Sequence, residues 1–430
     1  MRSAAQRELS WTQHEREFAA LRNLSARVGS DPFLVQASNG NTSIKFNGTM
    51  WIKASGKLLA HARQDDLFVA VNLAAAEKCL RDDVAIPARD GGDAALQPSI
   101  ETPMHAVLRH RIVIHVHSVD AIAWAIREDG PEALKSRLGL LRWQWVPYAA
   151  SGNALAREVE KAVRRAPDTD VFVLGSHGLV ICGDTCEDAE KLLSSVERRL
   201  LITPRKYPVP DIAALEKIAI FPRWQVPEDR SLHALATDPV CRKILKGGVL
   251  YPCQAMFLGE TMPLMPAQSA AWLVDSKVAD RWGGQRKNLP FIAVEGCGVL
   301  LNSRISAAER ATLAALAEVL LRTEESAPLR YLSAAEVAEV IGAGAYGSAK
   351  AALPVVTSAA KVSATAGAVH SVAAKQLWSA QRMRNAAMHI PLWDEGRRIL
   401  YIPNVCAAWL GSHAKRLRHR ISATRFVSGS

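Results

Sequence analysis

The sequence predicts an α/β protein in which helices flank a mostly antiparallel sheet. Segments with helical periodicity alternate with short apolar runs of strand length, and turns rich in Gly, Asn and Ser separate these runs. The 430 residues suffice for two or three domains, and a hydrophobic content of 49% excludes disorder for most of the chain. We therefore expect an α/β sandwich followed by a second, smaller α/β unit.

The first expected domain, residues 9–205, begins with a helix over 9–29. In that helix Phe18, Leu21 and Leu24 are spaced for one buried face. The further strands expected in this domain cover 42–46, 50–53, 67–71, 111–117, 171–174 and 179–182. The further helices cover 74–81, 102–108, 121–127, 152–165 and 186–201. The segment 204–226 contains several prolines and is expected to be a connection.

Two histidines end one of these strands, and a third follows another. His115 and His117 are two residues apart, so their side chains point to the same face of the strand, and His177 lies in the turn after 171–174. Three imidazoles fill three corners of a tetrahedral zinc site and leave the fourth open for substrate, as in catalytic zinc sites. A His-x-His pair alone is more often structural, but His177 and the upstream Glu101 favour a metal. Two further histidines are expected to be structural: His105 and His110.

Three polar turns precede the histidine pair. Residues 38–43 and 54–57 are rich in small polar residues, the second contains Lys57, and Ser99 comes shortly before Glu101. Small residues with free backbone N–H groups and hydroxyls form nests for phosphate. One such turn is common, but three before a metal triad indicate a phosphorylated or carboxylated substrate.

Taken together, these motifs resemble the class II aldolase/adducin family over about residues 15–201. The motifs, in order, are Gly40-Asn41-Thr42-Ser43, Ala54-Ser55-Gly56, Glu101, His115-Val116-His117, Pro147-Tyr148 and Ser176-His177-Gly178-Leu179-Val180. The wider layout, including Arg330-Tyr331-Leu332-Ser333, is similar to the aldolase half of rhamnulose-phosphate aldolase/dehydrogenase fusions. A dehydrogenase activity is not expected here, because no credible dinucleotide motif follows.

The resemblance implies a class II aldolase-like α/β/α sandwich and a role for each motif. It implies that zinc, or another divalent metal, is bound by His115, His117 and His177. It implies that Glu101 is the proton shuttle and that Tyr148 reaches the site of a neighbouring subunit in a ring tetramer. It implies a phosphate cradle made by Gly40, Asn41, Ser55, Gly56 and Ser99. The family often has a second serine just before the glutamate, where this chain has Ile100.

The function expected from these roles is a zinc-dependent aldolase of a phosphorylated ketose. The metal would act as a Lewis acid on an enediolate, and a carboxylate beside it would exchange the proton on carbon. The same site would also serve a metal-dependent epimerase or decarboxylase of a sugar or oxo-acid phosphate. A non-catalytic, adducin-like interaction module is a third alternative, against which the intact histidine and glutamate set argues.

The second expected unit, residues 206–347, resembles part of the first. The strand, glycine turn and strand of 291–301 are similar to 172–181, and an Ala-, Leu- and Glu-rich helix follows each of them. Cys297 stands where His177 stood, so this unit is expected to be a degenerate repeat without metal ligands; chance similarity is the alternative. The glycines of 342–347 match G-x-G-x-x-G, but a helix precedes them, so they are interpreted as a helix end and linker.

The C-terminal extension, residues 348–430, is basic. It holds 12 Lys and Arg against 2 acidic residues, whereas the preceding 347 residues hold 41 against 40. The net charge of +11 therefore does not indicate nucleic-acid binding by the body of the protein. We interpret the tail as an extension; a surface for anionic lipid or RNA is the alternative. Seven cysteines in no regular framework, no apolar run of membrane-spanning length and no secretory signal favour a cytoplasmic protein.

Overall fold

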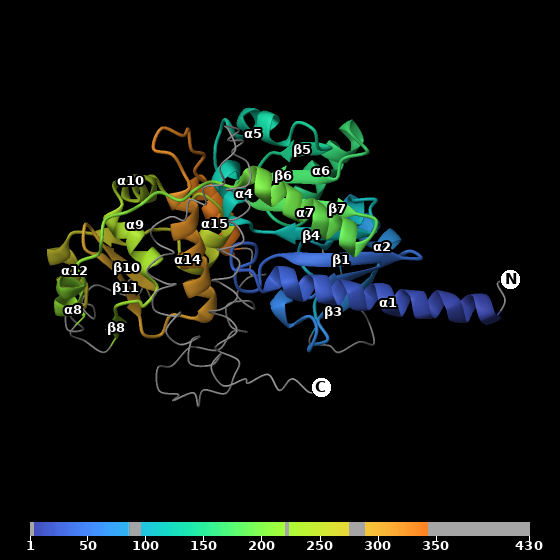
Figure 1. The fold of residues 1–430 in the computed structure, drawn as a ribbon, viewed down its shortest axis with the longest axis horizontal. Helices are drawn as coiled ribbons and strands as arrows, with labels where there is room; N and C mark the ends of the chain where they lie inside the picture. Colours follow the sequence, from blue (N-terminus) through green and yellow to red (C-terminus); the bar gives the residue numbers. More distant parts are fainter. Residues whose placement is uncertain (1–3, 85, 87–95, 220–222, 275–288, 343–430) are drawn as a thin grey trace, which may run out of the picture. The chain divides into compact units, whose positions relative to one another are not determined.

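The computed structural model describes residues 4–84, 86, 96–219, 223–274 and 289–342. All of them lie in one compact unit, Met1–Lys361 (Figure 1). The interpretations of the tail 348–430 and of the glycines beyond 342 lie outside the described residues.

A seven-stranded sheet forms the centre of the N-terminal domain, with strand order β3-β2-β1-β4-β7-β6-β5. Among its described strands β5 and β6 pair in parallel, and the other neighbours pair antiparallel, as the sequence predicts. The strands are β1 (Asn41–Phe46), β2 (Thr49–Lys53), β3 (Phe68–Asn72), β4 (Ile112–Val116), β5 (Trp143–Val146), β6 (Val171–Leu174) and β7 (Gly178–Gly183).

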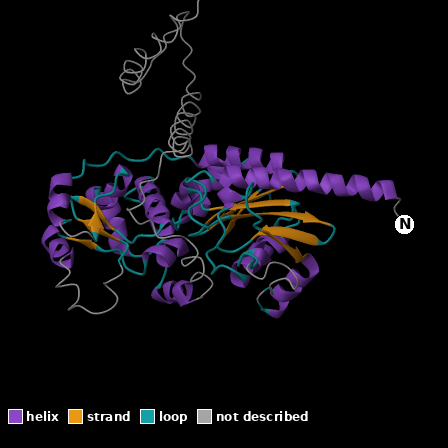
Figure 2. Cartoon of the chain, turned by 90° about the horizontal axis from the view of Figure 1, so that it is seen from below, coloured by secondary structure: helices purple, strands orange, loops and turns teal. Residues whose placement is uncertain are grey.

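Helices cover both faces of this sheet, which gives the expected sandwich (Figure 2). One face packs against α1 (Ala4–Gly29), α4 (Val119–Ala125), α5 (Gly130–Leu138) and α7 (Cys186–Leu200). The other packs against α2 (Leu73–Asp82), α3 (Thr102–Val107) and α6 (Asn153–Arg165). In β6, Val171 and Val173 enter the first core while Phe172 and Leu174 enter the second. Because alternate side chains of a strand face opposite sides, two covered faces produce a continuous apolar run.

Two elements of this domain escaped the sequence analysis. Helix α5 begins with Gly130-Pro131, and edge strand β5 keeps three of its four residues partly exposed, so its apolar signal is weak. The segment 204–226, expected to be a connection, also contains α8 (Ile212–Ile218) and β8 (Trp224–Gln225). A 3-10 turn, η1 (Leu59–His61), lies between β2 and β3.

A four-stranded sheet of order β8-β11-β10-β9 forms the second α/β unit. Its remaining strands are β9 (Leu264–Met265), β10 (Phe291–Val294) and β11 (Gly298–Asn302). Its remaining helices are η2 (Arg230–His233), α9 (Ala234–Thr237), α10 (Pro239–Gly247), α11 (Pro252–Leu258), α12 (Ala267–Val274), α14 (Ala307–Leu321) and α15 (Ala334–Gly342).

The β10–β11 hairpin has the same register as the β6–β7 hairpin. The last pair is Leu174 with Gly178 in one and Val294 with Gly298 in the other. The middle residue of each three-residue turn has a positive φ, +49° at Ser176 and +76° at Gly296. Duplication of the hairpin remains an interpretation, and this shared geometry supports it.

A buried ion pair joins the second unit to the first. The Arg322 Nε atom, after α14, lies 3.0 Å from Asp120 Oδ1 in α4, and both side chains are buried. The same carboxylate oxygen accepts a hydrogen bond from the Ile202 backbone N–H. Apolar residues of α4, including Val119 and Ile122, share one core with residues of α11 and α14. The two units are therefore packed together by both apolar and charged contacts.

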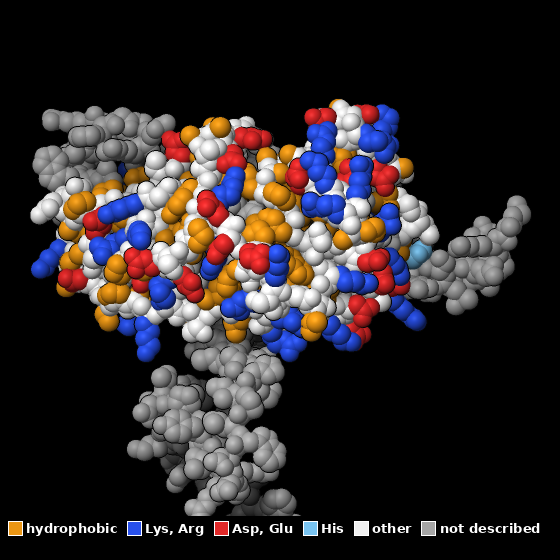
Figure 3. Space-filling model, turned by 90° about the horizontal axis from the view of Figure 1, so that it is seen from above, with side chains coloured by type: hydrophobic (Ala, Val, Ile, Leu, Met, Phe, Trp, Pro, Cys, Tyr) orange, Lys and Arg blue, Asp and Glu red, His pale blue; other side chains and the backbone are white. Residues whose placement is uncertain are grey.

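The surface of the described part is of mixed charge. On the face drawn in Figure 3, Lys and Arg are interspersed with Asp and Glu, in keeping with the near-neutral composition of the body. Within the described ranges, every helix is too short or too polar to cross a lipid bilayer.

We expect Arg322→Met to lower the free energy of unfolding by about 3–5 kcal/mol, because Asp120 loses its guanidinium partner while staying buried. Urea unfolding of purified protein measures this loss. The matched control is Lys135→Met, which removes one partner of the exposed Lys135–Glu132 pair and is expected to leave the midpoint unchanged. Equal midpoints for the two variants would contradict the structural role of the buried pair.

Candidate functional site

Strands β4 and β7 bring the three histidines together. Their antiparallel register pairs His115 with Val180 and Val116 with Leu179, so the end of β4 lies beside the turn that carries His177. A Cβ atom on Gly178 would lie 2.5 Å from the Val116 carbonyl oxygen, so any larger residue there would push the turn away from β4. After His117, the Ser118 hydroxyl accepts a hydrogen bond from the Ala121 N–H and caps α4.

Glu101 and the three histidines form one compact, buried group. One ligand atom from each lies within 4.8 Å of all the others. The Nε2 atoms of His115 and His117 are 3.1 Å apart. The two carboxylate oxygens of Glu101 lie 3.4 Å from His115 Nε2 and 3.2 Å from His177 Nε2. The structure thus gathers the four residues that the sequence pointed to, and this group could hold a metal ion.

Hydrogen bonds on the far side of two rings fit a metal on the Nε2 side. His115 Nδ1 lies 3.1 Å from the Leu179 carbonyl oxygen, which only accepts, so Nδ1 carries the proton and Nε2 keeps its lone pair. His117 Nδ1 lies 3.2 Å from Cys253 Sγ. Burial lowers the pKa of both His117 and His177, which favours the neutral imidazole that a metal requires.

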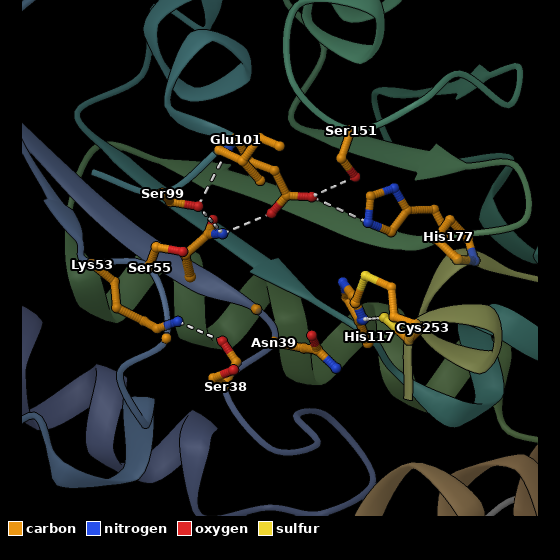
Figure 4. Close-up of a pocket in the computed structure, with 16 residues that line it drawn as sticks. Ser38, Asn39, Lys53, Ser55, Ser99, Glu101, His117, Ser151, His177 and Cys253 are labelled. Carbon is orange, nitrogen blue, oxygen red and sulfur yellow. Dashed lines mark hydrogen bonds and ion pairs between the residues drawn. The ribbon is translucent and has the colours of Figure 1, made fainter. Parts of the chain in front are cut away.

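Glu101 is ionised in this setting. Burial alone would raise its pKa, but contacts with His115 and His177 outweigh burial and hold the pKa well below its usual value. The Asn41 amide donates to Glu101 Oε2 at 2.7 Å and to Ser99 Oγ at 3.1 Å. The Ser151 hydroxyl lies 3.5 Å from Glu101 Oε1 (Figure 4). A carboxylate held in this way beside a candidate metal site can move a proton.

A cavity opens beside this group, and the predicted phosphate cradle lines it (Figure 4). The lining includes all five predicted cradle residues: Gly40, Asn41, Ser55, Gly56 and Ser99. Gly40 has a φ of +66°, and a Cβ atom there would lie 3.0 Å from the His115 carbonyl oxygen. The backbone can therefore turn toward the cavity only with glycine at this position. Ile100, which replaces the second serine of the family pattern, also lines the cavity.

The cation that lines the cavity is Lys53, whereas the sequence analysis pointed to Lys57. Lys57 is exposed, but Lys53 in β2 is buried and donates to the Ser38 carbonyl oxygen at 2.6 Å. Burial lowers the Lys53 pKa to about 8, and the Glu101 charge partly opposes the shift. The signal available in the sequence was a lysine within an apolar strand, two residues before Ser55.

The second unit also contributes to the cavity wall, which the sequence analysis did not foresee. Pro252, Cys253 and Met256 of α11 line the same cavity as His117 and His177. The expected role of this unit was packing and oligomerisation. No motif marks α11, because a short apolar helix far along the chain carries no sign of what it contacts.

Tyr148 lies away from the cavity lining in the described structure. The Arg330 guanidinium lies 4.4 Å from the centre of its ring, and the ring packs against a small core that includes Val249 and Leu332. Burial raises the Tyr148 pKa to about 12. Its catalytic role therefore stays a prediction that concerns a neighbouring subunit.

The two histidines expected to be structural lie outside the metal-ligand group. His105 Nδ1 lies 2.8 Å from the Ser43 hydroxyl, and His110 Nε2 lies 3.1 Å from Asp170 Oδ1. Each has a polar partner of its own, in keeping with the structural interpretation.

Comparison with known proteins places the N-terminal part of the chain in a family. Residues 21–203 match the family model described as Class II Aldolase and Adducin N-terminal domain. A curated relative, the "Uncharacterized oxidoreductase YuxG" of Bacillus subtilis (strain 168), is 29% identical over 189 residues, which cover 40% of this chain. The match spans 27% of the length of that relative.

Similar solved structures cover the same part of the chain. The N-terminal class II aldolase domain of a conserved protein from Thermoplasma acidophilum is 25% identical with a TM-score of 0.37, covering 42% of this chain and 90% of that one. The l-fuculose-1-phosphate aldolase from Thermus thermophilus is 21% identical with a TM-score of 0.31, covering 42% and 91%. On the family match, residues 21–203 of this chain form a domain of the class II aldolase and adducin family.

Proposed function

We propose that this protein is a divalent-metal-dependent aldolase, with zinc as the metal, that cleaves or forms a phosphorylated ketose. The observation that carries the proposal is the buried group of Glu101, His115, His117 and His177 at the end of a cavity lined by small polar residues. Three imidazoles and a carboxylate with their ligand atoms converging are the donor set of a catalytic zinc site.

The roles of the residues follow from their contacts. A divalent cation held by the three histidines supplies Lewis-acid stabilisation of negative charge on the substrate oxygens. In the cleavage direction the carbon–carbon bond breaks, the hydroxyl proton leaves as the aldehyde forms, and the remaining carbon takes up a proton. Glu101, ionised at rest, removes that proton in the condensation direction and returns it in cleavage, because the two directions share one path.

The anionic end of the substrate would occupy the polar part of the cavity. Gly40, Asn41, Ser55, Gly56 and Ser99 offer backbone N–H groups, an amide and hydroxyls there. Lys53 adds a buried positive charge on the same side. A phosphate group satisfies both the hydrogen-bond donors and the charge, which supports a sugar phosphate as substrate.

A homo-oligomer, with the tetramer of the family resemblance as its form, is part of the proposal. In such an assembly Tyr148 would exchange a proton with the aldehyde oxygen in a neighbouring subunit's site. Within one chain, Arg330 covers its ring.

The reaction is tested by incubating the protein with a panel of ketose phosphates and following the products, with and without a chelator. Dihydroxyacetone phosphate and an aldehyde would support the aldolase. An inverted sugar would identify an epimerase, carbon dioxide a decarboxylase, and the absence of metal together with any turnover would point to an adducin-like module.

His117→Ala is expected to abolish zinc binding, because it removes one of the three converging imidazoles. Elemental analysis after dialysis should fall from about one zinc per chain to background. His110→Gln, a histidine outside the group, serves as the control and should keep its zinc. A full equivalent of zinc in His117→Ala would refute the assignment.

Glu101→Gln is expected to keep its metal and to lose about two to four orders of magnitude in kcat, the usual contribution of a general acid or base. The glutamine keeps the size of the side chain and an oxygen that can accept from Asn41. Rate and metal content are measured on the same sample. Near-normal turnover in the metal-loaded variant would show that another group moves the proton.

Lys53 should make substrate binding depend on pH. Its pKa of about 8 means that the cation is present below pH 8 and lost above it, so kcat/KM should fall as the pH rises from 7 to 9. Lys53→Met should lower kcat/KM about tenfold to a hundredfold at pH 7, as expected for a hydrogen bond to a charged group, and should remove this limb of the pH profile. Lys57→Met, at an exposed lysine, is the control; an unchanged profile in Lys53→Met would contradict the role.

A further inference from the structure

Helix α11 of the second unit contacts the metal-ligand group directly. Cys253, the second residue of α11, places its Sγ atom 3.2 Å from His117 Nδ1, and Cys253 is buried. Pro252 and Met256 of the same helix line the cavity beside it (Figure 4). The contact thus joins residues that are 136 positions apart in the chain.

The position of Cys253 is set by the packing of α11. The Gln254 side chain, which is fully buried, accepts a hydrogen bond from the Leu250 N–H at 2.9 Å and so fixes the turn into the helix. Cys253, Phe257 and Leu258 belong to the core that spans α4, α11 and α14. The Arg322–Asp120 ion pair connects the end of α14 to α4, three residues after His117. The thiol is therefore held in place from both units.

A histidine that binds a metal through Nε2 carries its proton on Nδ1, and that N–H requires an acceptor. For His115 the acceptor is the Leu179 carbonyl oxygen, which belongs to the same domain. For His117 the atom in that position is Cys253 Sγ, which belongs to the second unit. Sulfur is a weak acceptor, but it lies within hydrogen-bonding distance of His117 Nδ1 in the described structure.

We propose that Cys253 is a positioning residue for His117: by accepting from Nδ1 it fixes the ring and the tautomer that turn Nε2 toward the metal. The second unit thereby completes the metal centre of the first, although it contributes no ligand itself. This inference rests on the proposed metal site.

The geometry separates this role from that of a fourth ligand. The ligand atoms of Glu101 and the histidines converge on the Nε2 side of the rings, whereas the sulfur lies at the opposite nitrogen of His117. Within the described residues, the group of converging ligand atoms consists of Glu101, His115, His117 and His177, without Cys253.

The test compares two substitutions of similar size in the full-length chain. Cys253→Ser keeps an acceptor for Nδ1–H, whereas Cys253→Val fills the space and removes it. Zinc affinity is measured by competition with a chromophoric chelator, which needs no substrate. We expect Cys253→Val to bind zinc about tenfold to a hundredfold more weakly, as is usual when the hydrogen-bond partner of a ligating histidine is lost. Cys253→Ser should stay within about threefold of the unsubstituted protein, since the hydroxyl replaces the acceptor.

Two controls accompany these variants. Cys241→Val replaces another buried cysteine of the second unit, one that contacts Arg205 and lies outside the cavity lining, and it should leave zinc affinity unchanged. Thermal unfolding of the metal-free proteins reports damage to packing, and Cys253→Ala takes the place of the valine variant if the latter does not fold. Cobalt is used as a spectroscopic probe in the unsubstituted protein and in Cys253→Ser.

Three results would overturn the inference. Zinc affinity in Cys253→Val equal to that of the unsubstituted protein would show that the thiol does not position His117. A sulfur-to-cobalt charge-transfer band that disappears in Cys253→Ser would make Cys253 a direct ligand. Equal losses of affinity in the serine and valine variants, matched by equal losses of metal-free stability, would reduce the contact to packing. If the unsubstituted protein binds no divalent metal, the proposed metal site itself fails, which is distinct from the first result.

Discussion

The candidate site depends on the antiparallel pairing of β4 with β7. The register that sets His115 opposite Val180 brings the end of β4 against the turn after β6, and Gly178 allows the two backbones to approach closely. Hydrogen bonds of the sheet thus place His177 beside His115 and His117, before any metal is bound. The rings meet at 4.9–5.0 Å between centres, a spacing that the strand geometry sets.

The environment of the four residues then selects their charge states. Burial favours neutral imidazoles at His117 and His177, while the ring nitrogens and the Asn41 amide keep Glu101 ionised. Low dielectric strengthens each of these contacts, because little water is present to screen them. Lys53 balances the anion-binding part of the same cavity. Acid, base and cation are therefore set apart within one small space, as a proton-transfer site requires.

The second unit bears on the site through packing. The apolar core shared by α4, α11 and α14, together with the buried Arg322–Asp120 pair, holds α11 against His117. The hairpin of β10 and β11 has kept the backbone pattern of β6 and β7, with Cys297 where His177 stands, and does not belong to the described metal-ligand group. A unit without metal ligands of its own can in this way still shape the metal centre of its neighbour.

The sequence by itself determined the α/β class, most elements of the N-terminal domain and the residues that gather at the site. It could do so because continuous apolar runs report strands buried on both faces, and because His115, His117 and the turn at His177 carry short-range patterns. Edge strand β5 escaped because partly exposed strands give a weak apolar signal. The contact of Cys253 with His117 and the burial of Lys53 in place of Lys57 were decided by tertiary structure alone. Each depends on which distant surfaces pack together, and a local pattern holds no record of a partner far along the chain.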